Sequence, residues 1–220
     1  MKKIIAAAGI LAAVAVPTAA GAAPGNGNGN NSTQTLTLKA TPNPVVAGRS
    51  VVLSGQLKGP NHAGRTVALG GAPYPFTPFN NNLATTVTTA AGNYAFTRRP
   101  QLNTLYRTHV GGVSSPNVTV LVRRRVSLRL SDYTPRRGQV VRFSGRACPT
   151  GDGLIVSIQR KTSTGSYRTV RRTRLREAAR CSVYSKRLRV YHDGRFRTVV
   201  ASDASHVRGF SRSRVADAHR

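Results

Sequence analysis

The chain carries two similar eight-residue stretches, GRSVVLSG at residues 48–55 and GQVVRFSG at residues 138–145. Four of the eight positions are identical, and the offset between the copies is 90 residues. At the same offset, Tyr106-Arg107-Thr108 matches Phe196-Arg197-Thr198. Two separate matches in one register indicate an internal repeat. We therefore predict two modules, residues 35–122 and 123–220, each of ordinary domain size.

Within each module, apolar residues alternate with polar ones. Leu36 and Leu38 alternate with threonine and lysine, and the same alternation holds over residues 126–130, 141–143, 156–158 and 187–190. Such alternation is typical of a strand with one buried and one exposed face. Clusters of Gly, Pro and Asn separate these runs, and no long stretch has the period of a helix. The pattern predicts an all-β chain of two antiparallel two-sheet sandwiches.

Three local motifs carry a family resemblance. They are PNPVVAGRSVVLSG at 42–55, the expected hairpin TTAAGNYAF at 88–96, and PQLNTLY at 100–106, which looks like a tyrosine corner before the sixth strand. Each module resembles the bacterial immunoglobulin-like and fibronectin-type-III-like domains that occur in tandem on secreted and cell-surface proteins. The resemblance implies two tandem immunoglobulin-like sandwiches, and a role as spacer, adhesion module or ligand binder.

The first residues have the pattern of a secretory signal. Lys2 and Lys3 precede an apolar run over residues 4–16, and small residues follow Pro17. This order predicts a signal peptide at residues 1–22. A membrane anchor is not expected, because an apolar run this short does not span a bilayer. Residues 23–34 are rich in Gly and Asn and predict a flexible linker. We expect a protein without a transmembrane segment that is secreted, extracellular or associated with the cell envelope.

The chain has two cysteines, Cys148 and Cys181, both in the second module. The resemblance implies that they flank neighbouring strands, and export favours their oxidation to a disulfide. The chain-entropy model gives such a bridge about 3–4 kcal/mol of stabilisation. The alternative is a free reactive thiol.

No pattern of residues points to catalysis, a metal or a cofactor. The five histidines have no ligand spacing, and the sequence has no nucleophile elbow, phosphate-binding glycine loop or zinc-protease motif. All six acidic residues fall in the second module, most of them in turn sequence. We predict that the protein is not an enzyme. An unrecognised catalytic site in the second module stays as an alternative.

The charge is strongly uneven. The chain has 34 Lys and Arg against 6 Asp and Glu, a net charge of +28, and the second module alone carries +19. Six arginines stand on the polar phase of its strands: Arg129, Arg142, Arg187 and Arg189 on one expected sheet, and Arg195 and Arg197 on the other. Arginine pairs with carboxylate, phosphate and sulfate groups, and a field this strong attracts polyanions.

The expected partner is an anionic cell-surface polymer or an acidic polysaccharide. Specific recognition of nucleic acid is not expected, because no helix is available for a major groove and only 6% of residues are aromatic. The alternative is a solvated surface on a spacer that binds no ligand.

A proline-rich segment holds three aromatic residues, Tyr74, Phe76 and Phe79. They form either an exposed ridge that contacts a ligand or a plug where the chain crosses between sheets. The sandwich architecture favours the plug.

Overall fold

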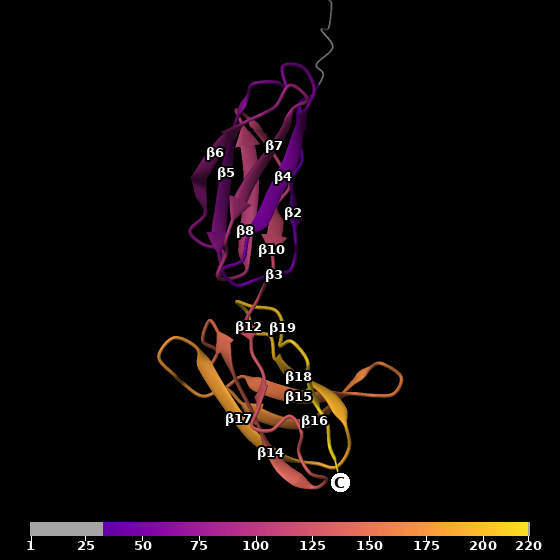
Figure 1. The fold of residues 1–220 in the computed structure, drawn as a ribbon. Coiled ribbons are helices and arrows are strands. Elements are labelled where there is room, and N and C mark those ends of the chain that lie inside the picture. Colours follow the sequence, from indigo (N-terminus) through magenta and orange to yellow (C-terminus); the bar gives the residue numbers. More distant parts are fainter. Residues whose placement is uncertain (1–32, 220) are drawn as a thin grey trace, which may run out of the picture. The chain divides into compact units, whose positions relative to one another are not determined.

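Residues 33–219 are described in a computed structural model of the protein. The predicted signal peptide and nearly all of the predicted linker lie outside these residues. The regular elements of the described part are strands, so the all-β prediction of tandem sandwiches is confirmed (Figure 1). No helix among residues 33–219 is long and apolar enough to cross a membrane.

The first sandwich consists of two facing sheets. One has β4 (Val51–Lys58) at its centre, with β1 (Thr35–Leu36) and β2 (Lys39–Thr41) along one side and β7 (Asn93–Arg98) along the other. The second has the order β10-β8-β5-β6, with β9 beside β8, and its strands are β5 (Thr66–Pro73), β6 (Asn80–Val87), β8 (Thr104–Val110), β9 (Val113–Ser114) and β10 (Val118–Val120). A short parallel pair joins β3 (Val45–Val46) to β11 (Val122–Arg123).

The second sandwich repeats this plan. In one sheet β14 (Gln139–Cys148) pairs with β12 (Arg125–Val126), β13 (Arg129–Leu130) and β17 (Ser182–Val190). The other has the order β16-β15-β18-β19, with β20 beside β18, and its strands are β15 (Ile155–Lys161), β16 (Tyr167–Arg174), β18 (Gly194–Val200), β19 (Gly209–Phe210) and β20 (Arg214–Ala216). The module boundary after residue 122 stays a prediction.

The repeated stretch forms the central strand of each sandwich and fills its core. Val51 and Leu53 on β4 are fully buried, as are Val141 and Phe143 at the matching positions of β14. The residues between them face outward, because successive side chains of a strand point to opposite faces. Phe143 packs edge-to-face on Phe196 of the facing sheet, with ring centroids 5.0 Å apart.

A buried tyrosine connects the two sheets of each sandwich. Tyr94 donates a hydrogen bond to the Thr37 carbonyl, and its hydroxyl also contacts the Thr108 hydroxyl at 2.7 Å. In the second sandwich Tyr184 donates to the Ser127 carbonyl at 2.7 Å and contacts Thr198 at 2.9 Å. Burial raises the pKa of both tyrosines, so each hydroxyl keeps its proton.

The backbone and the tyrosine around the last glycine of the repeated stretch, Gly55 or Gly145, explain why this position has no side chain. A Cβ atom on Gly55 would lie 1.8 Å from the Thr37 carbonyl oxygen, and one on Gly145 would lie 2.0 Å from that of Ser127. Both glycines also face the tyrosine hydroxyl. The repeat therefore preserves glycine because the backbone and the tyrosine leave no room for a side chain.

Two local expectations are wrong. Residues 88–96 do not form a hairpin, because β6 pairs with β5 in one sheet and β7 pairs with β4 in the other. The turn at Thr89–Gly92 therefore carries the chain between sheets. The segment with Tyr74, Phe76 and Phe79 was expected to fill a place where the chain crosses between the two sheets. It does not cross between them, because it joins β5 to β6 within one sheet.

Candidate functional site

Four of the six predicted arginines lie on one outer face. Arg142 on β14 stands directly opposite Arg187 on β17, and Arg189 stands opposite Val140. Arg129 on β13 pairs with Ser144 and therefore faces the same way. We call these residues, together with the outward-facing Arg146 of β14, the basic face: Arg129, Arg142, Arg146, Arg187 and Arg189. All five are exposed.

The basic face has no acidic counterpart. Within the described part of the chain, the ion pairs closer than 4.0 Å all involve Asp203, whose partners are Arg124 and His206. Arg142 and Arg187 form a cross-strand pair of like charges, which is destabilising because no carboxylate lies within ion-pair distance of them. The folded chain thus holds positive charges together that repel each other.

A groove continues the basic face around the sheet edge. It has a volume of about 550 Å³ and lies between β16 and β17. Arg171 lines it from β16, and Arg187 and Arg189 line it from β17, together with Tyr191. Three arginines therefore line one groove.

The remaining two predicted arginines lie on the other sheet. Arg195 and Arg197 belong to β18, where Arg195 pairs with Val215 and Arg197 with Gln159. Arg195 is exposed, whereas Arg197 is half-buried and its Nε donates a hydrogen bond to the Gln159 side chain at 2.9 Å. The two sheets turn their outer faces away from each other, so the six arginines make two surfaces and no single patch.

The predicted disulfide is confirmed. Cys148 ends β14, Cys181 precedes β17, and their sulfur atoms are bonded. Because β14 and β17 are neighbours along their whole length, the bridge closes one end of the sheet that carries the basic face. The thiols are therefore not available as nucleophiles.

The aromatic loop after β5 is largely exposed. Tyr74 and Phe76 pack edge-to-face on each other, with ring centroids 5.6 Å apart, and both keep more than a third of their surface in solvent. Phe79 instead covers Gly70 and lies under the Arg107 guanidinium, 5.1 Å from its ring centroid. Two of the three residues thus remain free to contact a ligand, and the third packs on its own sheet.

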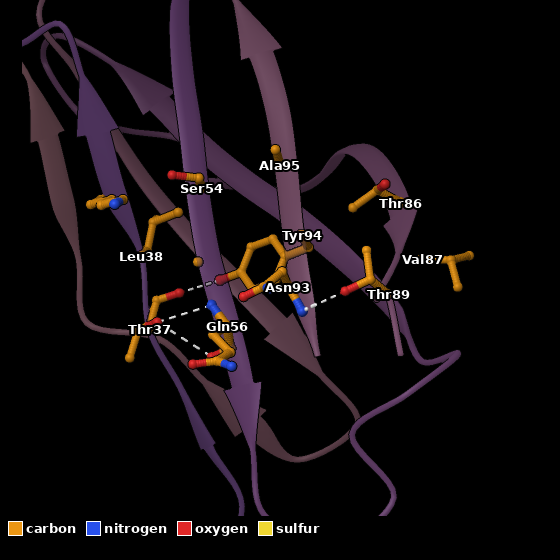
Figure 2. A pocket seen from close by; sticks show the side chains of 12 residues that line it. Thr37, Leu38, Ser54, Gln56, Thr86, Val87, Thr89, Asn93, Tyr94 and Ala95 are labelled. Carbon is orange, nitrogen blue, oxygen red and sulfur yellow. Dashed lines mark hydrogen bonds between the residues drawn. The ribbon is translucent and has the colours of Figure 1, made fainter. Parts of the chain in front are cut away.

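The first sandwich has a groove of a different character. It has a volume of about 710 Å³ and lies over β4 and β7, with hydroxyl and amide side chains around it (Figure 2). Thr37, Gln56 and Thr89 already use their side chains in hydrogen bonds to neighbouring backbone. Lys39 is the one charged residue among those that line the groove. The groove therefore lacks the charge of the basic face.

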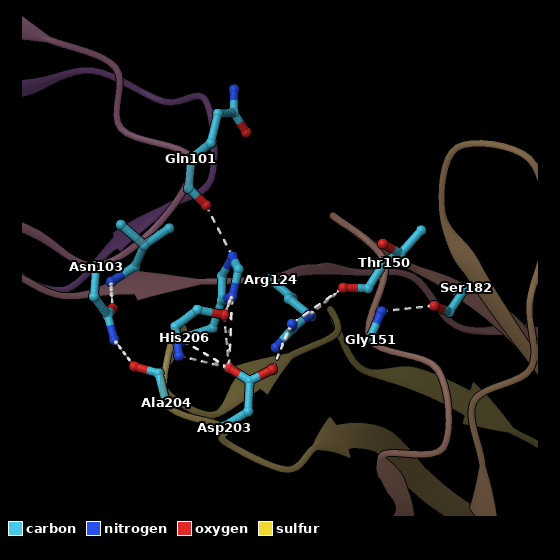
Figure 3. A network of polar contacts seen from close by, with 11 residues as sticks. Gln101, Asn103, Arg124, Thr150, Gly151, Ser182, Asp203, Ala204 and His206 are labelled. Carbon is cyan, nitrogen blue, oxygen red and sulfur yellow. Dashed lines mark hydrogen bonds and ion pairs between the residues drawn. The ribbon is translucent and has the colours of Figure 1, made fainter. Parts of the chain in front are cut away.

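A buried polar network contains the ion pair of Asp203 (Figure 3). Arg124 is 4% exposed, donates to Asp203 at 2.7 Å and also donates to the Thr150 carbonyl. Burial alone would raise the pKa of Asp203, but the hydrogen bond and charge of Arg124 hold it below its ordinary value. Arg124 is thus buried and hydrogen-bonded within the protein, whereas the arginines of the basic face are exposed.

His206 is the second side chain that contacts Asp203 in this network. Its Nε2 faces the Gln101 carbonyl at 2.8 Å and therefore carries the proton, while Nδ1 faces the Ser205 hydroxyl. Burial and the charge of Arg124 hold the pKa of His206 below its ordinary value. Asn103 completes the network with hydrogen bonds to the backbone of Val122, Ala204 and Ser205.

The other polar groups give no further site. His192 is exposed in a turn, and Asp193 accepts a hydrogen bond from the Ala218 backbone. Among residues 33–219, no three side chains of His, Cys, Asp or Glu come together as metal ligands would.

Sequence reasoning missed Arg146 and Arg171. Arg146 stands two pairs along β14 from Arg142, so the alternation that identified Arg142 was sufficient to find it. Arg171 was harder, because it pairs with the core residue Ile158 beside a register shift that leaves its neighbour Val170 without a partner on β15. A bulge shifts the side-chain phase and leaves no clear sequence signal.

Comparison with known protein families and with curated proteins finds no match. Among solved structures, the chain is similar to one described as the crystal structure of a tetra-tandem repeat in the extending region of a large adhesion protein. The sequence identity is 15% and the TM-score is 0.35, over 84% of this chain. The chain spans about half the length of that protein, 50%.

Proposed function

We propose that this protein is a secreted, non-enzymatic module of the cell envelope that binds anionic polymers through the basic face. The ligand class is a wall polymer or acidic polysaccharide with repeated carboxylate, phosphate or sulfate groups. The role is structural or adhesive, and the first sandwich presents or spaces the second.

The opposed pair Arg142 and Arg187 carries the proposal. Two like charges side by side, without a carboxylate within ion-pair distance, oppose folding and favour any ligand that neutralises both. A flat sheet sets the spacing, since outward residues repeat about every 6.6–6.8 Å along a strand. A linear polyanion thus meets regularly placed cations, and arginine binds oxyanions through paired hydrogen bonds.

The disulfide and the predicted signal peptide support an oxidising, extracellular location. Structural disulfides persist outside the reducing cytosol. For a protein in that location, the accessible polyanions are envelope polymers and acidic polysaccharides.

Retention on immobilised heparin and on isolated cell wall tests the proposal. We expect the mature chain to stay bound at physiological salt, and the quadruple variant R129S/R142S/R187S/R189S to elute. The matched control is R137S/R168S/R208S/R212S, which removes the same charge from exposed positions outside the basic face.

The control separates a site from overall charge. Elution of the quadruple variant with retention of the control supports the basic face. Equal loss in both variants would leave only non-specific attraction, and a native chain that is not retained would favour a spacer without ligand.

A further inference from the structure

The outer face of the β16-β15-β18-β19 sheet carries a row in which aromatic rings alternate with guanidinium groups. The guanidinium carbon of Arg197 lies 3.8 Å from the ring centroid of Tyr167 and 5.1 Å from that of Phe210. Arg123 lies on the same Phe210 ring, 5.5 Å from its centroid. Each distance is within the range of a cation–π contact.

Arg197 is held more firmly than any arginine of the basic face. Tyr167 lies on the β16 side of it and Phe210 on the β19 side, and Gln159 accepts its Nε hydrogen at 2.9 Å. No acceptor for its two Nη groups is found among the described residues, and the side chain remains half-exposed. The outer edge of this planar group is therefore the part left for a ligand.

Fixing a guanidinium before binding raises affinity for a ligand of matching shape. The side chain loses its conformational freedom on folding, so little further loss accompanies binding. A planar guanidinium matches the plane of a carboxylate and binds it through two parallel hydrogen bonds.

We propose that the Nη edge of Arg197 is a preformed binding site for a carboxylate of an acidic polysaccharide. Two exposed cations extend the site on the same face: Arg195, two residues before Arg197 on β18, and Lys161, two residues after Gln159 on β15. Together they supply charge for the next acidic sugars along the chain. This site is separate from the basic face.

Binding of three polymers to the mature chain tests this site. The probes are polygalacturonate, which carries carboxylates, dextran sulfate and inorganic polyphosphate. The variant R197K keeps the charge but loses the paired hydrogen bonds, and R195K is the matched control on the same strand and face. We expect R197K to weaken polygalacturonate binding about tenfold while R195K changes it less than about twofold. Dextran sulfate and polyphosphate, whose oxyanions also accept hydrogen bonds from arginine, show whether the Nη edge takes other anions as well.

Two results would overturn the proposal. One is an equal effect of R197K and R195K on polygalacturonate, and the other is polygalacturonate binding that R197K does not weaken. A native chain that binds heparin but not polygalacturonate would also overturn it while leaving the basic face intact. If R197K does not unfold cooperatively, Tyr167→Leu replaces it, because that variant keeps Arg197 and frees its side chain. Undiminished binding of polygalacturonate by Tyr167→Leu would refute the role of the ring.

Discussion

Replacing four arginines of the basic face should change how binding depends on salt. The variant R129S/R142S/R187S/R189S leaves only Arg146 of the five residues. Each contacted cation releases counterions from the polymer, so the logarithm of the binding constant falls by about 0.7 per cation for each decade of salt with a flexible strand. Because its exposed arginines have no acidic partner, the whole basic face is available for these contacts.

The structure sets the expected size of this change. With all five arginines engaged, the slope of log K against log salt is about −3.5, and with Arg146 alone it is about −0.7. Raising salt from about 50 to about 150 mM then weakens binding about fiftyfold in the native chain and about twofold in the variant. The native chain therefore gains most from its basic face at low salt.

Isothermal titration with a heparin oligosaccharide over a series of salt concentrations measures both slopes. The control R137S/R168S/R208S/R212S should keep a slope near that of the native chain, although its net charge equals that of the variant. The variant should be as stable as the native chain or slightly more so, because it removes the like-charge pair of Arg142 and Arg187. Equal slopes in the variant and the control would refute the reasoning.

Three further predictions concern the fold. The double variant Cys148→Ser/Cys181→Ser should have a free energy of unfolding lower by about 3–4 kcal/mol, because the 33-residue loop is no longer closed. Denaturant titration measures this loss. Two free thiols in the denatured, unreduced native chain would contradict the bridge. Tyr184→Phe should lower the free energy of unfolding by about 1–3 kcal/mol, because the Ser127 carbonyl and the Thr198 hydroxyl lose a buried partner. A loss of stability no larger than that of the exposed control Tyr133→Phe would count against these hydrogen bonds. The pKa of His206 is lowered in the fold, so the unfolded chain binds more protons and stability should fall as pH drops below about 6.5, the ordinary value. His206→Asn should flatten this decline in thermal midpoint while the exposed control His192→Asn keeps it, and an unchanged decline in His206→Asn would exclude His206 as its cause.

Period-two patterning predicted what depends on strand geometry. The alternation over residues 126–130 and 187–190 identified strands and their outward arginines, since a pleated strand leaves no other phase for them. The disulfide was predicted on another ground, because the family resemblance placed Cys148 and Cys181 beside neighbouring strands.

The remaining features depend on contacts between distant residues. The turn at residues 88–92 resembles a hairpin in composition, yet β7 pairs with β4 and not with β6 because the apolar side chains of β7, Tyr94 and Phe96, complete the core behind β4. The network of Arg124, Asp203 and His206 joins residues about eighty positions apart, with no local signal. The tyrosine pair was detectable, because Tyr94 and Tyr184 share the 90-residue offset of the repeat.

Chemical-shift mapping of the mature chain with a short heparin oligosaccharide at physiological salt tests the central claim most directly. Binding through the basic face predicts that the largest amide shifts fall on β13, β14 and β17, around Arg129, Arg142 and Arg187. Shifts confined to the first sandwich, or no shifts at a saturating concentration, would contradict it.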